Sequence, residues 1–316
     1  MNLLKSDYQM IKNWMYRNAR PLDIARWQYQ FENGSKEAVL KSLLAYQNED
    51  GGFGNAIEAD SWNPNSSPYS TADAIIILEE IKFNDGNHPV IRGMLRYLDN
   101  TTDFTGKHWL SVICTNNDYA HAPWWTYADN FTEDWGYTPT AIIAGFILCF
   151  ADKNTEIYKK AEKIASDAID KYLFGIMPNG EAYRAIKREG EINCYHHLLK
   201  CLEAGKLTHL YKISELKDAL KNQAQLFIER DTSKWDQYCC KPSVFVTSPH
   251  SLFFKGNEEI INAELNYILN KRNEQGVWDI TWSWGAYEKE FTISENWWKA
   301  NIVISNMLLL KNFNRL

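Results

Sequence analysis

The sequence lacks a long hydrophobic run and a regular spacing of cysteines, and each absence excludes a class of protein. Its longest apolar stretch, residues 141–151, is shorter than the roughly 20 apolar residues that a membrane-spanning helix needs. Residues 1–20 contain no apolar core of the secretory type, so we expect a cytoplasmic protein. The six cysteines follow neither a disulfide framework nor a zinc-knuckle pattern, and we expect reduced thiols.

The sequence also lacks basic character. It has 34 Lys and Arg against 40 Asp and Glu, which gives a formal net charge of −6. A nucleic-acid partner requires a basic face to neutralise phosphates, and an anionic membrane surface requires a Lys/Arg cluster. We therefore expect no nucleic acid, no integral membrane segment and a small-molecule ligand; oligomeric state is left open.

Aromatic residues are abundant instead, with 13 Trp, 17 Tyr and 14 Phe making up 14% of the chain. An ordinary core does not need so many tryptophans. We expect some of them to line a cavity, because indole rings supply large apolar surfaces that carry a polar N–H.

Most apolar residues recur at the 3, 4 and 7 spacing of amphipathic helices. This periodicity predicts about twelve helices, at residues 5–18, 21–33, 35–48, 68–83, 87–100, 139–152, 155–173, 191–204, 213–229, 249–255, 257–271 and 295–312. From the third helix on, short links alternate with long ones at 49–67, 101–138, 174–190, 230–248 and 272–294. Antiparallel helices joined by short links at one end place their long links together at the other end.

Several predicted helices begin alike. Ser67-Pro68, Thr138-Pro139 and Ser248-Pro249 each offer an N-cap hydroxyl followed by proline, and Thr292 to Glu295 has the spacing of a capping box. Helices near 68–83, 139–152 and 295–312 are apolar all round, whereas 155–173 and 213–229 are striped with charge, as expected of buried and covering helices. We predict an all-α fold in which six inner and six outer helices form an α6/α6 double-ring toroid. Residues 1–316 would form one domain with a central cavity.

Two short motifs suggest a repeat. Gln47, Gly51 and Phe53 follow one predicted helix, and Arg272, Gly276 and Trp278 follow another with the same spacing. The spacing resembles the QW repeat of the terpenoid cyclase and protein prenyltransferase superfamily, in which Gln, Gly and Trp hold these positions. The resemblance implies the α/α toroid and an isoprenoid substrate. The family's catalytic motifs do not carry over: the chain has no Asp-Asp pair, no Asp-x-Cys zinc motif and no Cys-Gly-Glu-Gln thioester sequence.

Three residues are the predicted catalytic groups. Glu58 and Asp60 follow the first motif in the same long loop, and carboxylates that face an aromatic cavity can act as general acid or base. We expect one of them to face the cavity and the other to hold the loop. His121, in the longest loop, is the predicted partner in proton transfer, because histidine is the residue type suited to proton transfer near neutral pH.

Aromatic residues of the long loops, with one histidine, are the predicted substrate-binding groups. They are Trp62, Trp124, Trp125, Trp135, His250, Trp278, Trp282, Trp284, Tyr287 and Trp297. Indole rings at a cavity mouth stack on sugar rings or form a wall for isoprenoid chains. Packing of each loop by its own aromatic residues is the structural alternative.

A metal site is not expected. Cys194, His197 and Cys201 share one helix face, but one helix does not supply tetrahedral zinc geometry over that length. No cofactor is predicted.

The sequence therefore leaves two classes of function open. The first is an enzyme that performs acid/base chemistry on an isoprenoid-like or cyclic substrate, or on a glycan whose glycosidic bond lies between two acids. The second is a non-catalytic toroid that binds a small molecule or a peptide. Polar groups in the pocket would favour sugars, and an apolar floor would favour isoprenoids.

Overall fold

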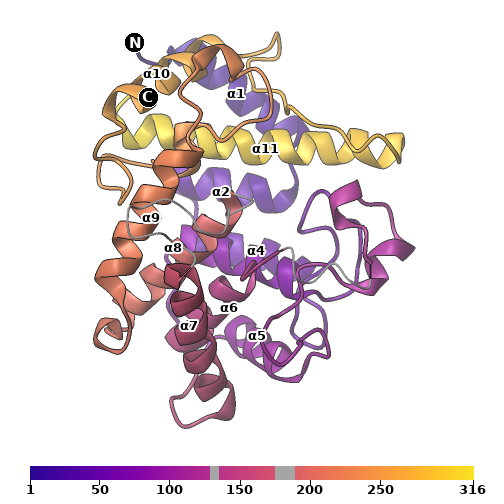
Figure 1. Ribbon diagram of the computed structural model, residues 1–316. Coiled ribbons are helices and arrows are strands. Elements are labelled where there is room, and N and C mark those ends of the chain that lie inside the picture. Colours follow the sequence, from indigo (N-terminus) through magenta and orange to yellow (C-terminus); the bar gives the residue numbers. More distant parts are fainter. Residues whose placement is uncertain (129–134, 175–188) are drawn as a thin grey trace. The chain divides into compact units, whose positions relative to one another are not determined.

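The protein is all-α in the computed structural model, which describes residues 1–128, 135–174 and 189–316 (Figure 1). Within these ranges there are eleven α-helices, and extended segments meet only at isolated β-bridges. None of the described helices is both long enough and apolar enough to cross a membrane. Most of the predicted loop at 174–190 lies outside the described residues.

The helices group into two compact units. We call Leu44–Leu226 the central unit and Met1–Leu43 with Phe227–Leu316 the terminal unit. Each is described by itself, and the single domain stays a prediction.

The central unit contains six α-helices and four 3-10 helices within the described residues. They are η1 (Leu44–Tyr46), α4 (Pro68–Glu80), α5 (Pro89–Asn100), η2 (Cys114–Asp118), η3 (Pro123–Trp125), α6 (Thr140–Phe150), α7 (Glu156–Phe174), α8 (Glu189–Ala204), η5 (Thr208–Leu210) and α9 (Ile213–Phe227).

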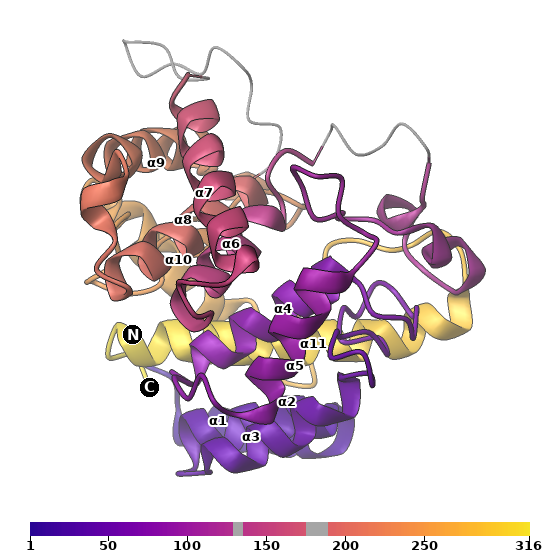
Figure 2. The same cartoon turned by 90° about the horizontal axis from the view of Figure 1, so that it is seen from below.

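Helix α6 forms the core of the central unit. Every residue from Thr140 to Leu148 is buried, and α6 packs against α4, α7 and α8 (Figure 2). Gly145 allows α8 to pack closely on α6, since a Cβ there would lie 3.1 Å from the Cβ of Cys201 on α8. By contrast, α7 buries one stripe of residues and exposes its charged face, as an outer helix does.

The terminal unit is built from both ends of the chain. It contains α1 (Lys5–Asn18), α2 (Pro21–Phe31), α3 (Lys36–Leu43), η6 (Thr232–Lys234), η7 (Pro242–Val244), α10 (Glu258–Asn270) and α11 (Glu288–Asn312). Helix α11 packs against α1 and α2 (Figure 1). The two chain ends lie side by side, and the Leu3 N–H donates to the Arg315 carbonyl over 2.8 Å.

The predicted helices are present with one exception. Residues 249–255 form turns, so the helix predicted there is wrong. The segment is short, and Ser248 uses its side chain to accept from the His250 N–H in a local turn.

The predicted helix starts are right at only one of four places. Ser67 caps α4 by accepting from the Ser70 N–H over 3.0 Å, with Pro68 in the first turn. At α6 the N-cap position is Pro139 rather than Thr138, and no helix follows Ser248. The proposed capping box at Thr292 lies inside α11, which begins at Glu288; the Thr292 hydroxyl donates to the Glu288 carbonyl.

Candidate functional site

The two repeated motifs form the same turn. In the central unit, the Asn48 N–H donates to the Gly52 carbonyl and the Gly51 N–H donates to the Asn48 carbonyl. In the terminal unit, Asn273 makes the corresponding two bonds with Val277 and Gly276. In the first motif, Gln47 also supports the turn, because its side-chain amide donates to the Gly51 carbonyl (2.9 Å).

Glycine is required in both turns. Gly51 has a φ of 98°, and a Cβ there would lie 2.1 Å from the Gly93 carbonyl oxygen of α5. Gly276 has a φ of 83°, and its Cβ would lie 2.5 Å from the Met10 sulfur. Both motifs therefore have a structural role: they let a turn approach a neighbouring helix closely.

Three tryptophans in loops donate hydrogen bonds to carbonyls at helix ends. The indole N–H of Trp109 donates to the Leu98 carbonyl (3.2 Å), that of Trp278 to the Ile268 carbonyl (2.9 Å), and that of Trp235 to the Glu229 carbonyl (3.0 Å). Each acceptor lies at the end of the preceding helix or just beyond it, where carbonyls lack helical partners. Part of the tryptophan content thus serves the scaffold, a role that composition did not indicate.

The loop that carries Glu58 and Asp60 pairs with the loop that carries His121. The Trp62 N–H donates to the Ala120 carbonyl and the Ala122 N–H donates to the Asp60 carbonyl, with a bridge between Ser61 and His121. Two segments 60 residues apart in the sequence, each proposed to be functional, are therefore neighbours.

Amide side chains hold the two loops together. The Asn63 amide donates to Thr115 (2.9 Å) and to Asn116 (2.8 Å), and the Asn116 amide donates to the Trp125 carbonyl (3.1 Å). Networks of this kind fix a loop in one conformation.

The carboxylates and the histidine are buried within this pairing. Glu58 is 9% exposed, Asp60 3% and His121 7%. Glu58 accepts a hydrogen bond from the Asp60 N–H (2.9 Å), so the Glu58 carboxylate holds the loop. One nitrogen of His121, Nδ1, lies 2.7 Å from the Tyr119 carbonyl, and Nε2 lies 3.1 Å from the Thr126 hydroxyl. The first contact requires a proton on Nδ1, which leaves Nε2 to accept from Thr126 in the neutral ring.

An aromatic cluster follows the paired loops. The rings of Trp125 and Trp135 are stacked, with centroids 5.4 Å apart and planes 16° apart. Tyr69, in the first turn of α4, makes edge contacts with both rings. Trp125 is buried, whereas Trp62, Trp124 and Trp135 are half-buried. The structure thus brings Trp125 and Trp135 together.

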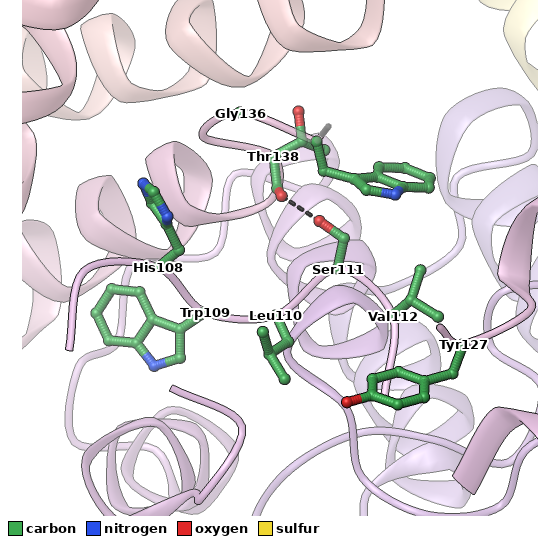
Figure 3. Close-up of a pocket in the computed structure, with 9 residues that line it drawn as sticks. His108, Trp109, Leu110, Ser111, Val112, Tyr127, Gly136 and Thr138 are labelled. Atoms are coloured by element: carbon green, nitrogen blue, oxygen red, sulfur yellow. Dashed lines mark hydrogen bonds between the residues drawn. The ribbon is translucent and has the colours of Figure 1, made fainter. Parts of the chain in front are cut away.

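A small pocket lies beside this cluster (Figure 3). Figure 3 shows His108 and Tyr127 on opposite sides of it, with the Ser111 hydroxyl donating to the Thr138 carbonyl between them. Burial lowers the pKa of His108, and Lys171 and Lys107 lower it further. The cavity volume of about 10 Å³ is enough for one water molecule and excludes a substrate.

The remaining predicted residues lie in the terminal unit. Trp278 and Trp284 are 5% and 2% exposed and belong to its core. Trp282 is half-buried and meets Trp298 edge to face at 5.3 Å, while the Arg20 guanidinium lies 5.2 Å from the Trp297 ring centroid.

Two predicted residues of this unit are exposed at the surface. Tyr287 is 45% exposed at the start of α11, and His250 lies in an exposed turn. Because no helix begins at Ser248, His250 does not lie at a helix N-terminus. Binding by these residues stays a prediction.

The three residues considered for zinc have separate partners. The Cys194 thiol lies 3.6 Å from the Thr138 hydroxyl, His197 hydrogen-bonds to Glu79, and Cys201 receives the Cys149 thiol at its carbonyl oxygen. Although burial acts to raise it, the pKa of Glu79 is lowered to about 2 by His197 and Lys200. Glu79 on α4 thus pairs with His197 and Lys200 on α8, and the two cysteines take no part in these ion pairs.

Sequence reasoning missed one further group of residues. An open polar pocket of the central unit includes Asp50, Tyr97 and Asp103. Asp50 lies inside the repeated motif and was assigned no role, and Tyr97 has the spacing of an ordinary core residue. Only their proximity in space distinguishes them.

Comparisons with known proteins give no further assignment. No family model matches the chain, no curated protein matches it, and no solved structure matches it.

Proposed function

We propose that the protein is a glycan-active enzyme of the α/α-toroid type, in which Asp60 acts as acid or base. Glu58 holds the Asp60 backbone and His121 positions the facing loop. The half-buried Trp135, which stacks on the buried Trp125, offers the surface on which a sugar ring stacks.

One observation carries the proposal: two loops that are distant in the sequence pair through their backbones and bring the Asp60 segment beside the His121 segment. Acid/base groups must be held within a fraction of an ångström of their working positions. The Asn63 and Asn116 amides supply such support here. Binding and catalytic residues lie disproportionately on loops that a rigid scaffold positions.

The polar character of the loops favours a hydroxylated substrate over an isoprenoid. Amide and hydroxyl side chains dominate the contacts around the paired loops, and the larger central-unit pocket is lined by carboxylates and amides. A hydrocarbon chain in that pocket would displace water from its carboxylates and amides without offering them a hydrogen bond, at a cost of about 1–3 kcal/mol for each group left unsatisfied.

The test is a turnover assay on oligosaccharides. The wild-type protein is incubated with a panel of neutral and acidic oligosaccharides, and new reducing or unsaturated ends are measured. Asp60→Asn is expected to lower the rate about 10²- to 10⁴-fold, the usual contribution of a general acid or base. Asp118→Asn, at an exposed position of η2, is the matched control and should leave the rate unchanged.

Three outcomes decide the matter. Cleavage that depends on Asp60 and not on Asp118 supports the proposal. Consumption of isoprenyl diphosphates in a parallel reaction would support the isoprenoid alternative instead. Sugar binding without turnover would make the protein a non-catalytic binding module.

We also infer that the helices close into a double ring of the α/α-toroid kind, with one helix fewer among the described residues than the predicted α6/α6 arrangement. Within the central unit α4 and α8 both pack on α6, while the charge-striped α7 covers it, which is the alternation of inner and outer helices that a toroid requires. Small-angle X-ray scattering tests this: a closed ring gives a compact profile, and an open solenoid gives an extended one.

A further inference from the structure

A second polar pocket of the central unit has no role in the chemistry above. It is open, has a volume of about 530 Å³, and is lined by Asp50, Asn65, Ser66, Arg96, Tyr97, Asn100, Thr101, Thr102 and Asp103. Pockets for small molecules usually measure about 300–1,000 Å³. These residues come from the loop after the Asn48 turn and from the C-terminal part of α5 with the chain that follows it.

Tyr97 gives the first sign that the pocket holds a ligand. Its side chain is 5% exposed, and its hydroxyl has no hydrogen-bond partner among the residues that the structure describes. A buried hydroxyl without a partner costs about 1–3 kcal/mol. A ligand oxygen that accepts from this hydroxyl would recover that free energy.

The carboxylates give the second sign. Asp50 receives the Gly52 N–H (2.8 Å) and the Ser66 hydroxyl (2.7 Å), and both bonds end on Oδ1. The other oxygen, Oδ2, has no hydrogen bond to the described part of the chain, and Asp50 is exposed, so this oxygen is open to water or to a ligand. Burial raises the pKa of Tyr97, the neighbouring Thr101 side chain acts to lower it, and the charges of Asp103 and Asp50 raise it, so the hydroxyl stays protonated and remains a donor.

Asp103 differs from Asp50 in its surroundings. Burial raises the pKa of Asp103, against a weaker opposing effect of Thr101. The loop is fixed by its backbone, since the Leu110 N–H donates to the Asp103 carbonyl over 2.9 Å. The side chain is thus presented from a fixed position.

We propose that this pocket binds one sugar ring, with Asp50 and Asp103 accepting hydrogen bonds from its hydroxyl groups and Tyr97 donating to one of its oxygens. Hydroxyl groups that both donate and accept match a wall of carboxylates and amides beside a phenol. The inference rests on the proposed function in one respect, because it names a subsite for the same class of substrate.

The charges of the lining residues indicate which class of sugar the pocket would bind. The pocket contains two carboxylates and one guanidinium, and the guanidinium of Arg96 is engaged by the Glu49 carbonyl (2.9 Å) and the Asp50 carbonyl (3.3 Å). Arg96 keeps its positive charge, but the two carboxylates outnumber it, so the pocket is acidic on balance. A neutral or amino sugar fits it, whereas a uronic acid meets like charge.

The test is a binding titration by NMR with the intact protein. The probes are glucose, galactose, mannose, N-acetylglucosamine, glucosamine and glucuronate. We expect a neutral or amino sugar to bind, with glucuronate at least ten-fold weaker than glucose. Tyr97→Phe and Asp103→Asn should each raise Kd about ten-fold. Tyr119→Phe and Asp99→Asn, at exposed positions of the same unit, are the matched controls and should leave Kd unchanged.

The outcomes separate this inference from the proposed function. Binding that depends on Tyr97 and Asp103 supports the pocket even if no oligosaccharide is cleaved. Cleavage that depends on Asp60, together with sugar binding that neither variant weakens, overturns the pocket and leaves the enzyme in place. Failure of every probe to bind, or glucuronate binding as tightly as glucose, also overturns it. A thermal melt of each variant shows that the fold is retained.

Discussion

The buried carboxyl of Glu264 should make the stability of the protein fall as pH rises. Glu264, on α10, is 1% exposed and accepts from the Ser243 N–H (2.7 Å) and the Ser243 hydroxyl (2.6 Å). Burial raises the pKa of Glu264 from 4.5 to about 7, against the opposing effect of the two hydrogen bonds from Ser243.

The sign and size follow from proton linkage. Between pH 4.5 and 7 the unfolded chain has lost the Glu264 proton while the folded chain keeps it, so the free energy of unfolding falls with rising pH. One pKa unit corresponds to about 1.4 kcal/mol, and the shift therefore amounts to about 3 kcal/mol. Above pH 7 both states are charged and the difference stays constant.

The perturbation is Glu264→Gln, whose side chain does not titrate and still offers an oxygen to Ser243. We expect the free energy of unfolding of the variant minus that of the wild type to increase by about 3 kcal/mol from pH 4.5 to pH 8. Urea unfolding at half-unit pH steps measures it. Subtracting wild type from variant at each pH removes the contribution of every other titrating group.

The matched control is Glu259→Gln, at an exposed position of the same helix, which reports the background of the substitution. A difference curve for Glu264→Gln that is flat from pH 4.5 to 8 would refute the reasoning. A curve that falls with pH would reverse its sign and refute it equally.

Three further predictions concern the scaffold. Gly51→Ala should lower the free energy of unfolding by at least about 2 kcal/mol, because the new methyl group adds backbone strain and a clash with Gly93. Gly106 has a φ of 88° and no atoms within 4 Å of an added Cβ, so Gly106→Ala measures the backbone strain alone. Trp278→Phe should cost about 1–3 kcal/mol in denaturant unfolding, because the Ile268 carbonyl loses its donor, and an unchanged midpoint would contradict the proposed fastening role. Glu79→Gln should destabilise the protein at pH 7, because the depressed pKa of Glu79 contributes stability that is fully present above pH 4.5. This loss of stability should disappear as pH falls toward 2. A loss that does not depend on pH would disprove the ion-pair explanation.

Helix positions were largely predictable because periodicity reports which face of a helix is buried. The apolar α6 and the charge-striped α7 were recognised as core and cover for this reason. The start of α11 was not, because residues 288–294 are mostly polar and their register gives little signal. A serine followed by proline predicted a helix start correctly at Ser67 and wrongly at Ser248. At Ser248 the side chain accepts a hydrogen bond within a local turn instead.

The candidate site was predictable in its parts and not in its assembly. The positions of Asp60 and His121 in long loops indicated both residues. The pairing of the two loops depends on backbone hydrogen bonds, which the identity of the side chains does not predict. Tryptophan content suggested a cavity wall, whereas Trp109 and Trp278 fasten loops to helix ends. Tyr97 has the pattern of a core residue, and its unsatisfied hydroxyl is a property of three-dimensional packing alone.

The central claim is that the polar loops of residues 44–226 hold a hydroxylated substrate and not a hydrocarbon. Native mass spectrometry of the wild-type protein with neutral oligosaccharides and with isoprenyl diphosphates in the same solution tests it most directly. We predict a stoichiometric oligosaccharide adduct that Asp103→Asn weakens. An adduct with the isoprenyl diphosphate, and none with any oligosaccharide, would contradict the account.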